Sequence, residues 1–306
     1  MTRFNADLLL MLCAFIWGTA FVAQKDLHAA AWPGLFVCSR FAISAVLLLP
    51  LAVREAWRDA GKHPAGPRQW ALAVTIGLCL CLAATLQQVA ITGTTATNGG
   101  FLTAVYVALV PFAVWLIAGT PPRLGVLAAC AVTVAGAWLL AGGGLGRSWG
   151  RGDLTLLAAD FVWALHITLI ARFLGQVNRP YLLCFVQFAV TALGAGGYTL
   201  YAEHAEIADL IAALPSILYA GIASGGIAYT LQIVAQRHAP AAEAALIMSL
   251  ESVFAAIAGA VMLHERLTLV AALGCLLIFT GAVMVELAPA LRRSVMQLVR
   301  GGEQQP

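Results

Sequence analysis

The sequence predicts an all-α polytopic membrane protein, with ten transmembrane helices arranged as two inverted five-helix repeats. Three observations lead to this fold class. Of the 306 residues, 61% are hydrophobic and only 10% are charged, whereas soluble domains carry about 25% charged residues. Ten apolar stretches are each long enough to cross a hydrocarbon core of roughly 30 Å. The two halves of the chain also match each other in sequence.

The ten predicted spans are separated by short polar segments. A glycine-rich linker at residues 141–152 divides them into two groups of five. We therefore expect one five-helix repeat at residues 1–146, a second at 147–288, and a cytoplasmic tail at 289–306. The spans cover residues 6–24, 32–53, 70–91, 97–118, 123–141, 152–172, 180–200, 210–236, 240–263 and 267–288.

The distribution of Lys and Arg predicts the orientation, because cytoplasmic loops carry an excess of both. Twelve of the seventeen lie on the side of the N-terminus, and Arg40 lies inside a span. The opposite side holds four, which are Lys25, Arg147, Arg151 and Arg266. We expect a multi-pass protein of the plasma membrane, in a bacterium the inner membrane, with both termini in the cytoplasm.

The repeat is visible as three ordered matches between the halves, at offsets of 146, 147 and 145 residues. Five spans per half is an odd number, so the halves insert with opposite orientations. Inverted repeats are typical of transporters, whose substrate site lies near the midplane between the repeats. The matches pair DLLLMLCAFIW (7–17) with DLTLLAADFVW (153–163), PGLFVCSRFA (33–42) with PYLLCFVQFA (180–189), and TLQQVA (85–90) with TLQIVA (230–235).

Four motifs resemble the EamA-type branch of the drug/metabolite transporter superfamily. They are WGTAFV (17–22), SRFAISAVLLL (39–49), GGFLTAVYVALVP (99–111) and AALIMSLESVFAAIAGAVMLHERLT (244–268). The resemblance covers nearly all ten spans. It implies that spans 1–4 and 6–9 enclose a central cavity, with spans 5 and 10 peripheral, and that the protein exports or exchanges small metabolites. Many relatives carry proline where this chain has Ser252.

Two carboxylates lie deep within predicted spans. Glu251 is eleven residues after Pro240, about 16 Å along a helix, where a charge costs roughly 2.5–3.5 kcal/mol or more. Glu251 is a candidate for proton coupling or substrate contact, or a structural carboxyl bonded to a neighbouring helix. Asp160 is the second proton-coupling candidate, or a buried acid satisfied by Arg40 or a hydroxyl. The repeat partner of Glu251 is Tyr106, so the halves differ chemically at this position.

Arg40 also lies within a span and needs a partner. It either forms a structural ion pair or provides the counter-charge for an anionic group of the substrate. Its repeat partner Gln187 keeps the polarity without the charge.

Further candidates are repeat partners of each other. Trp17 and Trp163 lie near the middle of their spans, where they form a cavity wall or ordinary helix packing. Gln87 pairs with Gln232. Asn98 pairs with Glu243, and both fall at helix starts, where capping is an alternative role. The substrate-binding candidates are Trp17, Arg40, Gln87, Asn98, Tyr106, Asp160, Trp163, Gln187, Gln232 and Glu251.

Two glycines in the eighth span, Gly221 and Gly225, form a GxxxG spacing that Gly226 extends. Close helix approach explains this spacing, and a local break in a cavity-lining helix is the alternative.

Other functional classes lack sequence support. The chain has no metalloprotease, nucleophile-elbow, Walker or Rossmann motif, so we expect no enzyme activity, catalytic residue, cofactor or metal. The seven cysteines all fall in apolar runs. A net charge of +3, with scattered arginines, argues against nucleic acid as a partner. A channel would need a continuous polar stripe, and the polar residues here are isolated.

The function that we predict is export of a small metabolite, such as an amino acid, by alternating access. The partners are a small-molecule substrate and the lipid bilayer, and the protein is a monomer or weak homodimer. A proton gradient is the expected energy source, with uncoupled facilitation as the alternative. Multidrug efflux is the second candidate function, and an intramembrane enzyme is less favoured.

Overall fold

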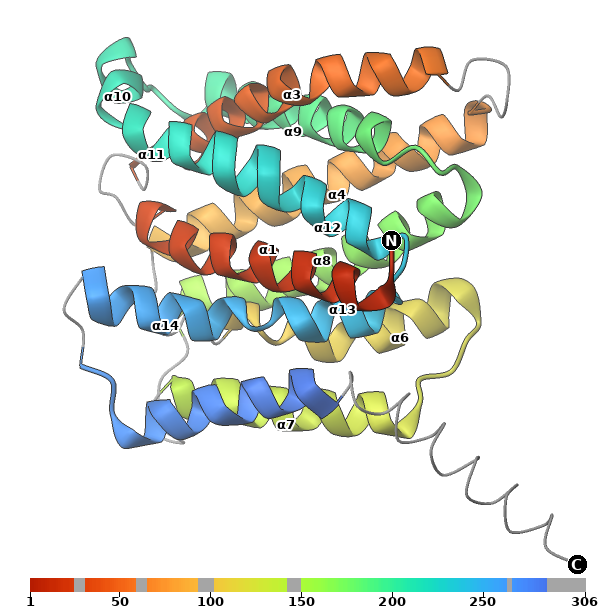
Figure 1. The fold of residues 1–306 in the computed structure, drawn as a ribbon. Coiled ribbons are helices and arrows are strands. Elements are labelled where there is room, and N and C mark those ends of the chain that lie inside the picture. The colour runs from red at the N-terminus through yellow and green to blue at the C-terminus, as the bar shows by residue number, and fades with distance from the viewer. Residues whose placement is uncertain (25–30, 59–64, 93–101, 142–149, 263–265, 285–306) are drawn as a thin grey trace, which may run out of the picture.

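A computed structural model of the chain is helical. The residues that it describes form helices and contain no strand. Figure 1 shows the helices running roughly alongside one another in one bundle. The structure describes residues 1–24, 31–58, 65–92, 102–141, 150–262 and 266–284.

Proline marks the starts of several helices, because the first N–H groups of a helix have no intrahelical partner to lose. Pro33, Pro67 and Pro180 each begin one. The helices of the first half are α1 (Arg3–Gln24), α3 (Pro33–Arg58), α4 (Pro67–Thr92), α6 (Tyr106–Ala118) and α7 (Leu124–Leu140).

The second half has more helical segments because two of its spans change geometry along their length. A π-helix, η1, lies inside the eighth predicted span, and a turn divides the ninth. The segments are α8 (Arg151–Gln176), α9 (Pro180–Ala202), α10 (Ile207–Ala212), α11 (Leu214–Tyr219), η1 (Ala220–Tyr229), α12 (Thr230–Gln236), α13 (Ala241–Met248), α14 (Glu251–Met262) and a last helix at Leu269–Met284.

The described helices are those of a multi-pass membrane protein. Seven helical segments are long and apolar enough to cross a membrane, and three shorter apolar helices accompany them. Large apolar side chains point outward, with Leu116 89% and Leu200 90% exposed. Such a surface is stable in hydrocarbon and unfavourable in water.

Packing between the halves is reciprocal. α1 contacts η1, α12 and α14, while α8 contacts α4 and α6. α3 packs along α9, and Figure 1 shows these two side by side. Each first helix of a half therefore packs against the third and fourth spans of the other half.

The pair formed by α7 and the helix at Leu269–Met284 lies along one edge of the bundle (Figure 1). A Cβ on Gly136 of α7 would come within 2.7 Å of the Gly274 carbonyl oxygen, and a Cβ on Gly274 within 2.5 Å of the Gly136 carbonyl oxygen. Glycine at both positions therefore lets the two backbones touch. This peripheral placement matches the expectation for spans 5 and 10.

Candidate functional site

A cavity of about 50 Å³ is lined by residues from both halves of the chain. Seven of the ten predicted candidates lie in its wall, which is built by α1, α3, α4, α6, α8, η1, α12 and α14. These seven are Trp17, Arg40, Gln87, Tyr106, Trp163, Gln232 and Glu251. The cavity has room for water molecules, since a single water needs roughly 10–15 Å³.

Three candidates are placed elsewhere. Asp160 and Gln187 are buried but do not line the cavity, and Asn98 falls outside the described residues. The helix that carries Gln187, α9, supplies no lining residue among those described. The enclosure expected from spans 1–4 and 6–9 thus lacks a contribution from span 7, because α9 packs behind the wall, against α3 and α4.

Sequence reasoning missed five lining residues, of which Tyr229 is the most central. Its ring centroid lies 4.8 Å from that of Trp17 and 6.3 Å from that of Trp163. Tyr229 directly precedes the repeated TLQIVA motif, and that proximity was the available signal. The five are Gln24, Thr103, Ile167, Ser224 and Tyr229.

Hydrogen bonds fix the orientation of both repeat-related tryptophans. The indole N–H of Trp17 donates to the backbone oxygen of Ser224 at 3.2 Å. The indole N–H of Trp163 donates to Oε1 of Gln87 at 2.9 Å. Each bond joins the first helix of one half to the third span of the other half. The two tryptophans are therefore held as rigid walls of the cavity.

Arg40 is only 5% exposed. Its guanidinium carbon lies 5.3 Å from the ring centroid of Phe36 and 4.8 Å from that of Phe41. Within the described residues its side chain makes no ion pair, and its Nε has no hydrogen-bond partner. The structural ion pair considered from the sequence is therefore not formed with any described carboxylate.

Glu251 is the first residue of α14, directly after a turn at Ser249 and Leu250. The side chain is buried, and its Oε1 has no hydrogen-bond partner. The expected alternative, a carboxyl bonded to a neighbouring helix, is not observed at this oxygen.

Asp160 is fully buried in α8, and neither of its carboxylate oxygens has a hydrogen-bond partner. It is satisfied by neither Arg40 nor a hydroxyl, contrary to the structural alternative considered from the sequence. Six residues further along α8, His166 Nε2 shares a hydrogen bond of 2.9 Å with Gln187 Oε1. Gln187 therefore contributes to a buried polar contact behind the cavity wall.

The GxxxG glycines lie where η1 meets α3. A Cβ on Gly221 would stand 2.9 Å from the backbone oxygen of Arg40, and one on Gly225 would overlap the Ser44 hydroxyl. That hydroxyl donates to the Gly221 carbonyl at 2.8 Å. Close helix approach and a local change of helix geometry were the two roles considered from the sequence. Both are found, because the glycines lie within the π-helix η1 and pack closely against α3.

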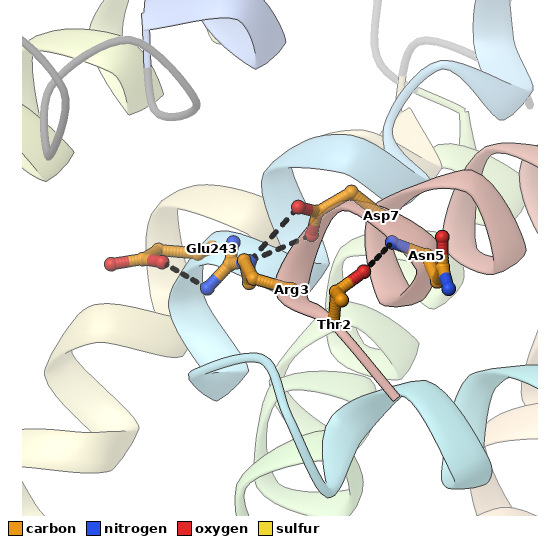
Figure 2. Close-up of polar contacts among 5 residues, drawn as sticks. All are labelled: Thr2, Arg3, Asn5, Asp7 and Glu243. Carbon is orange, nitrogen blue, oxygen red and sulfur yellow. Dashed lines mark hydrogen bonds and ion pairs between the residues drawn. The ribbon is translucent and has the colours of Figure 1, made fainter.

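Glu243 makes an ion pair in the first turn of α13. It accepts a hydrogen bond of 2.7 Å from Nη1 of Arg3, whose Nε lies 2.8 Å from Oδ1 of Asp7 (Figure 2). The cluster ties the beginning of α1 to the beginning of α13. Glu243 does not line the cavity.

Within the described part of the chain, no three His, Cys, Asp or Glu side chains lie close enough together to hold a metal ion.

Comparison with known proteins agrees with this architecture. An uncharacterized transporter from Archaeoglobus fulgidus is 29% identical over 286 residues, which cover 93% of this chain and 87% of that protein. A solved crystal structure superimposes with a TM-score of 0.73 at 17% identity, over 96% of this chain and 99% of that one. The sequence matches the EamA-like transporter family twice, over residues 4–142 and 150–287. The chain belongs to the EamA-like transporter family.

Proposed function

We propose that this protein carries a small organic solute through the membrane by alternating access, with ten spans arranged as two inverted five-helix repeats. One observation carries the proposal. Three pairs of repeat partners, Trp17 with Trp163, Gln87 with Gln232, and Tyr106 with Glu251, all line a single cavity. A site at the interface of the repeats is where such transporters bind substrate.

Helix breaks support the same proposal. A turn at Ala104 and Val105 precedes Tyr106, and a turn at Ser249 and Leu250 precedes Glu251. The two breaks are 145 residues apart, which is the offset that relates TLQQVA to TLQIVA. Discontinuous helices beside a midplane cavity are typical of transporters.

Movement is required because a cavity of about 50 Å³ is too small for a metabolite. The turns and η1 are the places where the helices bend most easily, since their backbone hydrogen bonding is irregular. We therefore assign the structure to a compact state of the transport cycle, and we assign the change in cavity size to motion about these segments.

Export coupled to protons is the proposed mode. Glu251 faces the cavity and Asp160 lies buried nearby on α8, which packs against α6 and α4. Oε1 of Glu251 and both carboxyl oxygens of Asp160 lack a hydrogen-bond partner, so each carboxyl can hold a proton. Proton movement through such intramembrane acids is a common use of their costly position.

Multidrug efflux is the second candidate, favoured by the aromatic cluster of Trp17, Trp163 and Tyr229 at the cavity. Flat aromatic walls accept many apolar ligands without directional bonds. We rank it below metabolite transport because the same cavity also presents Arg40, Gln87 and Gln232, whose polar groups select for matching polar substrates.

Transport into proteoliposomes tests the proposal. Purified protein is reconstituted, and a panel of amino acids, organic acids, amines and cationic dyes is assayed with and without a pH gradient. We expect saturable uptake of one chemical class, stimulated by the same solute on the opposite side. Uptake no faster than in empty liposomes for the whole panel contradicts transport, and unsaturable uptake without counter-stimulation indicates a channel.

A further inference from the structure

We infer that Arg40 binds a carboxylate of the transported solute, so that the site selects organic monoanions and zwitterions over their neutral or cationic analogues. This inference rests on the proposed function, since it names the substrate class of the same cavity. It starts from the guanidinium group, which is 5% exposed and lies in the cavity wall.

The protein leaves this cation without a counter-charge. Arg40 and Glu251 line the same cavity, but their side chains do not approach within the 4.0 Å of an ion pair. No other described carboxylate pairs with Arg40, and its Nε lacks a hydrogen-bond partner. A buried arginine without an anion is unfavourable, and the missing partner is most simply supplied by a ligand.

Packing holds the guanidinium in place in advance of binding. Its carbon lies over the rings of Phe36 and Phe41, at 5.3 Å and 4.8 Å from their centroids. Cation–π contacts stabilise the charge without using its N–H groups. The backbone at Arg40 is also held, because the Ser44 hydroxyl lies 2.9 Å from the Arg40 carbonyl oxygen and 2.8 Å from that of Gly221, and its single proton is shared between them. The planar donor group is therefore preorganised for a bidentate acceptor.

The charge of the ligand follows from the charge of the wall. Arg40 is the one Lys or Arg, and Glu251 the one Asp or Glu, among the described lining residues, so the wall matches a zwitterion, or a monoanion when Glu251 holds a proton. One cation matches a carboxylate, whereas a phosphate ester of about two negative charges would remain partly uncompensated. The other half supports this assignment, because the repeat partner Gln187 is uncharged and lies outside the cavity wall. The matching position in the second half therefore shows that the fold does not need a cation here, which supports a role for Arg40 in the cavity.

Acid and amide pairs test the inference on the unmodified protein. The probes are L-phenylalanine with L-phenylalaninamide and phenylacetate with phenylacetamide, together with the acids and amines of the wider panel. We expect that every transported solute carries a carboxylate and that its amide is transported roughly 100-fold less well, because the amide leaves a buried charge unpaired. Preferential transport of amides, amines or cationic dyes overturns the inference while supporting transport.

Variants of Arg40 provide the second test. Arg40→Gln should lower acid transport roughly 100-fold and leave amide transport unchanged, whereas Arg40→Lys should lose roughly 10-fold, because it keeps the charge without the bidentate geometry. The control is Arg54→Gln, which removes the same charge from an exposed position of the same helix and should transport normally. An Arg40→Gln protein that still prefers acids shows that Arg40 is structural.

Ligand binding separates this inference from the proposed function. The unfolding temperature of purified protein is measured with each acid and its amide. Acid-specific stabilisation that needs roughly 10-fold more acid in Arg40→Lys, in a protein without flux, supports the carboxylate site and contradicts transport. Stabilisation that is equal for acid and amide contradicts the site, and this readout holds even where Arg40→Gln does not fold.

Discussion

The two halves of the molecule break a helix at the same place but offer different chemistry there. In the first half a turn at Ala104 and Val105 leads into Tyr106, and in the second half a turn at Ser249 and Leu250 leads into Glu251. Both side chains line the cavity. The turn therefore occurs at matching positions in both halves. The residue that follows it is an acid only in the second half.

A second comparison lies one span earlier. α4 is a regular α-helix over Pro67–Thr92, whereas the corresponding part of the second half contains the π-helix η1. Gly225 of η1 corresponds to Leu80 of α4, which is fully buried. A helix at this place in the fold therefore does not require glycine, since the first half has leucine there. The glycine permits close contact with α3 and the local change of helix geometry in one half only.

The largest expected effect tests the acid. Glu251→Gln should abolish proton-dependent flux, at least roughly 100-fold, because a carboxamide fills the same space but carries no proton to exchange. The measurement is uptake into proteoliposomes with and without a pH gradient. An unchanged rate and pH response in this variant removes Glu251 from the coupling step.

Tyr106→Phe is the matched control in the other half. It removes one hydroxyl at the corresponding position and should preserve the response to the pH gradient. A loss as large as that of Glu251→Gln would mean that the two positions are functionally equivalent.

The next effect tests the glycines of η1. Gly225→Ala places a Cβ onto the Ser44 hydroxyl, and overpacking of this kind costs about 1–3 kcal/mol. We expect a lower unfolding temperature in detergent. The control is Gly125→Ala in α7, where an added Cβ meets nothing within 4 Å and helix propensity favours alanine. Equal stability of both variants would contradict the close contact between η1 and α3.

A smaller effect tests the symmetry of the tryptophans. Trp163→Phe removes the hydrogen bond to Gln87, and Trp17→Phe removes the one to Ser224. The loss of one such bond, about 1 kcal/mol, should raise the apparent KM about fivefold in each case. Trp57→Phe, at a position 79% exposed, should leave KM unchanged. A large change in KM from only one of the two variants would show that the two tryptophans contribute unequally to substrate binding.

The smallest effect concerns the ion pair between Arg3 and Glu243. The Arg3 side chain is 34% exposed, so solvent screens the pair, and we expect a coupling energy below about 1 kcal/mol. A double-mutant cycle with Arg3→Gln and Glu243→Gln, followed by thermal unfolding at low and high salt, measures it. A coupling that does not weaken with salt would place the pair in a more buried environment than the structure does.

Much of the candidate site followed from the repeat in the sequence. The matched motifs placed Trp17, Trp163, Gln87 and Gln232 in corresponding spans, and all four line the cavity. Equivalent residues of the two matching halves meet at this cavity, as the proposed inverted repeat requires. Asp160 was chosen for its depth alone, and depth does not tell whether a side chain faces a cavity or a neighbouring helix.

Tyr229 shows why helical periodicity could not predict the remaining lining residues. A π-helical stretch inserts residues into the helical turn and rotates the face of every residue after it. Counting by 3.6 residues through Ala220–Tyr229 therefore misplaces Tyr229. The turn before Glu251 has the same consequence for α14.

The amino-acid sequence by itself predicted the apolar segments, the match between the two halves and which polar residues fall inside apolar segments, because the bilayer imposes length and hydrophobicity on each segment separately. Only the tertiary structure decided which of those residues share a cavity, that η1 departs from α-helical geometry, and that Arg40 lies over Phe36 and Phe41 without a carboxylate. These features depend on helix rotation and on contacts between residues distant in the chain, which no local pattern specifies.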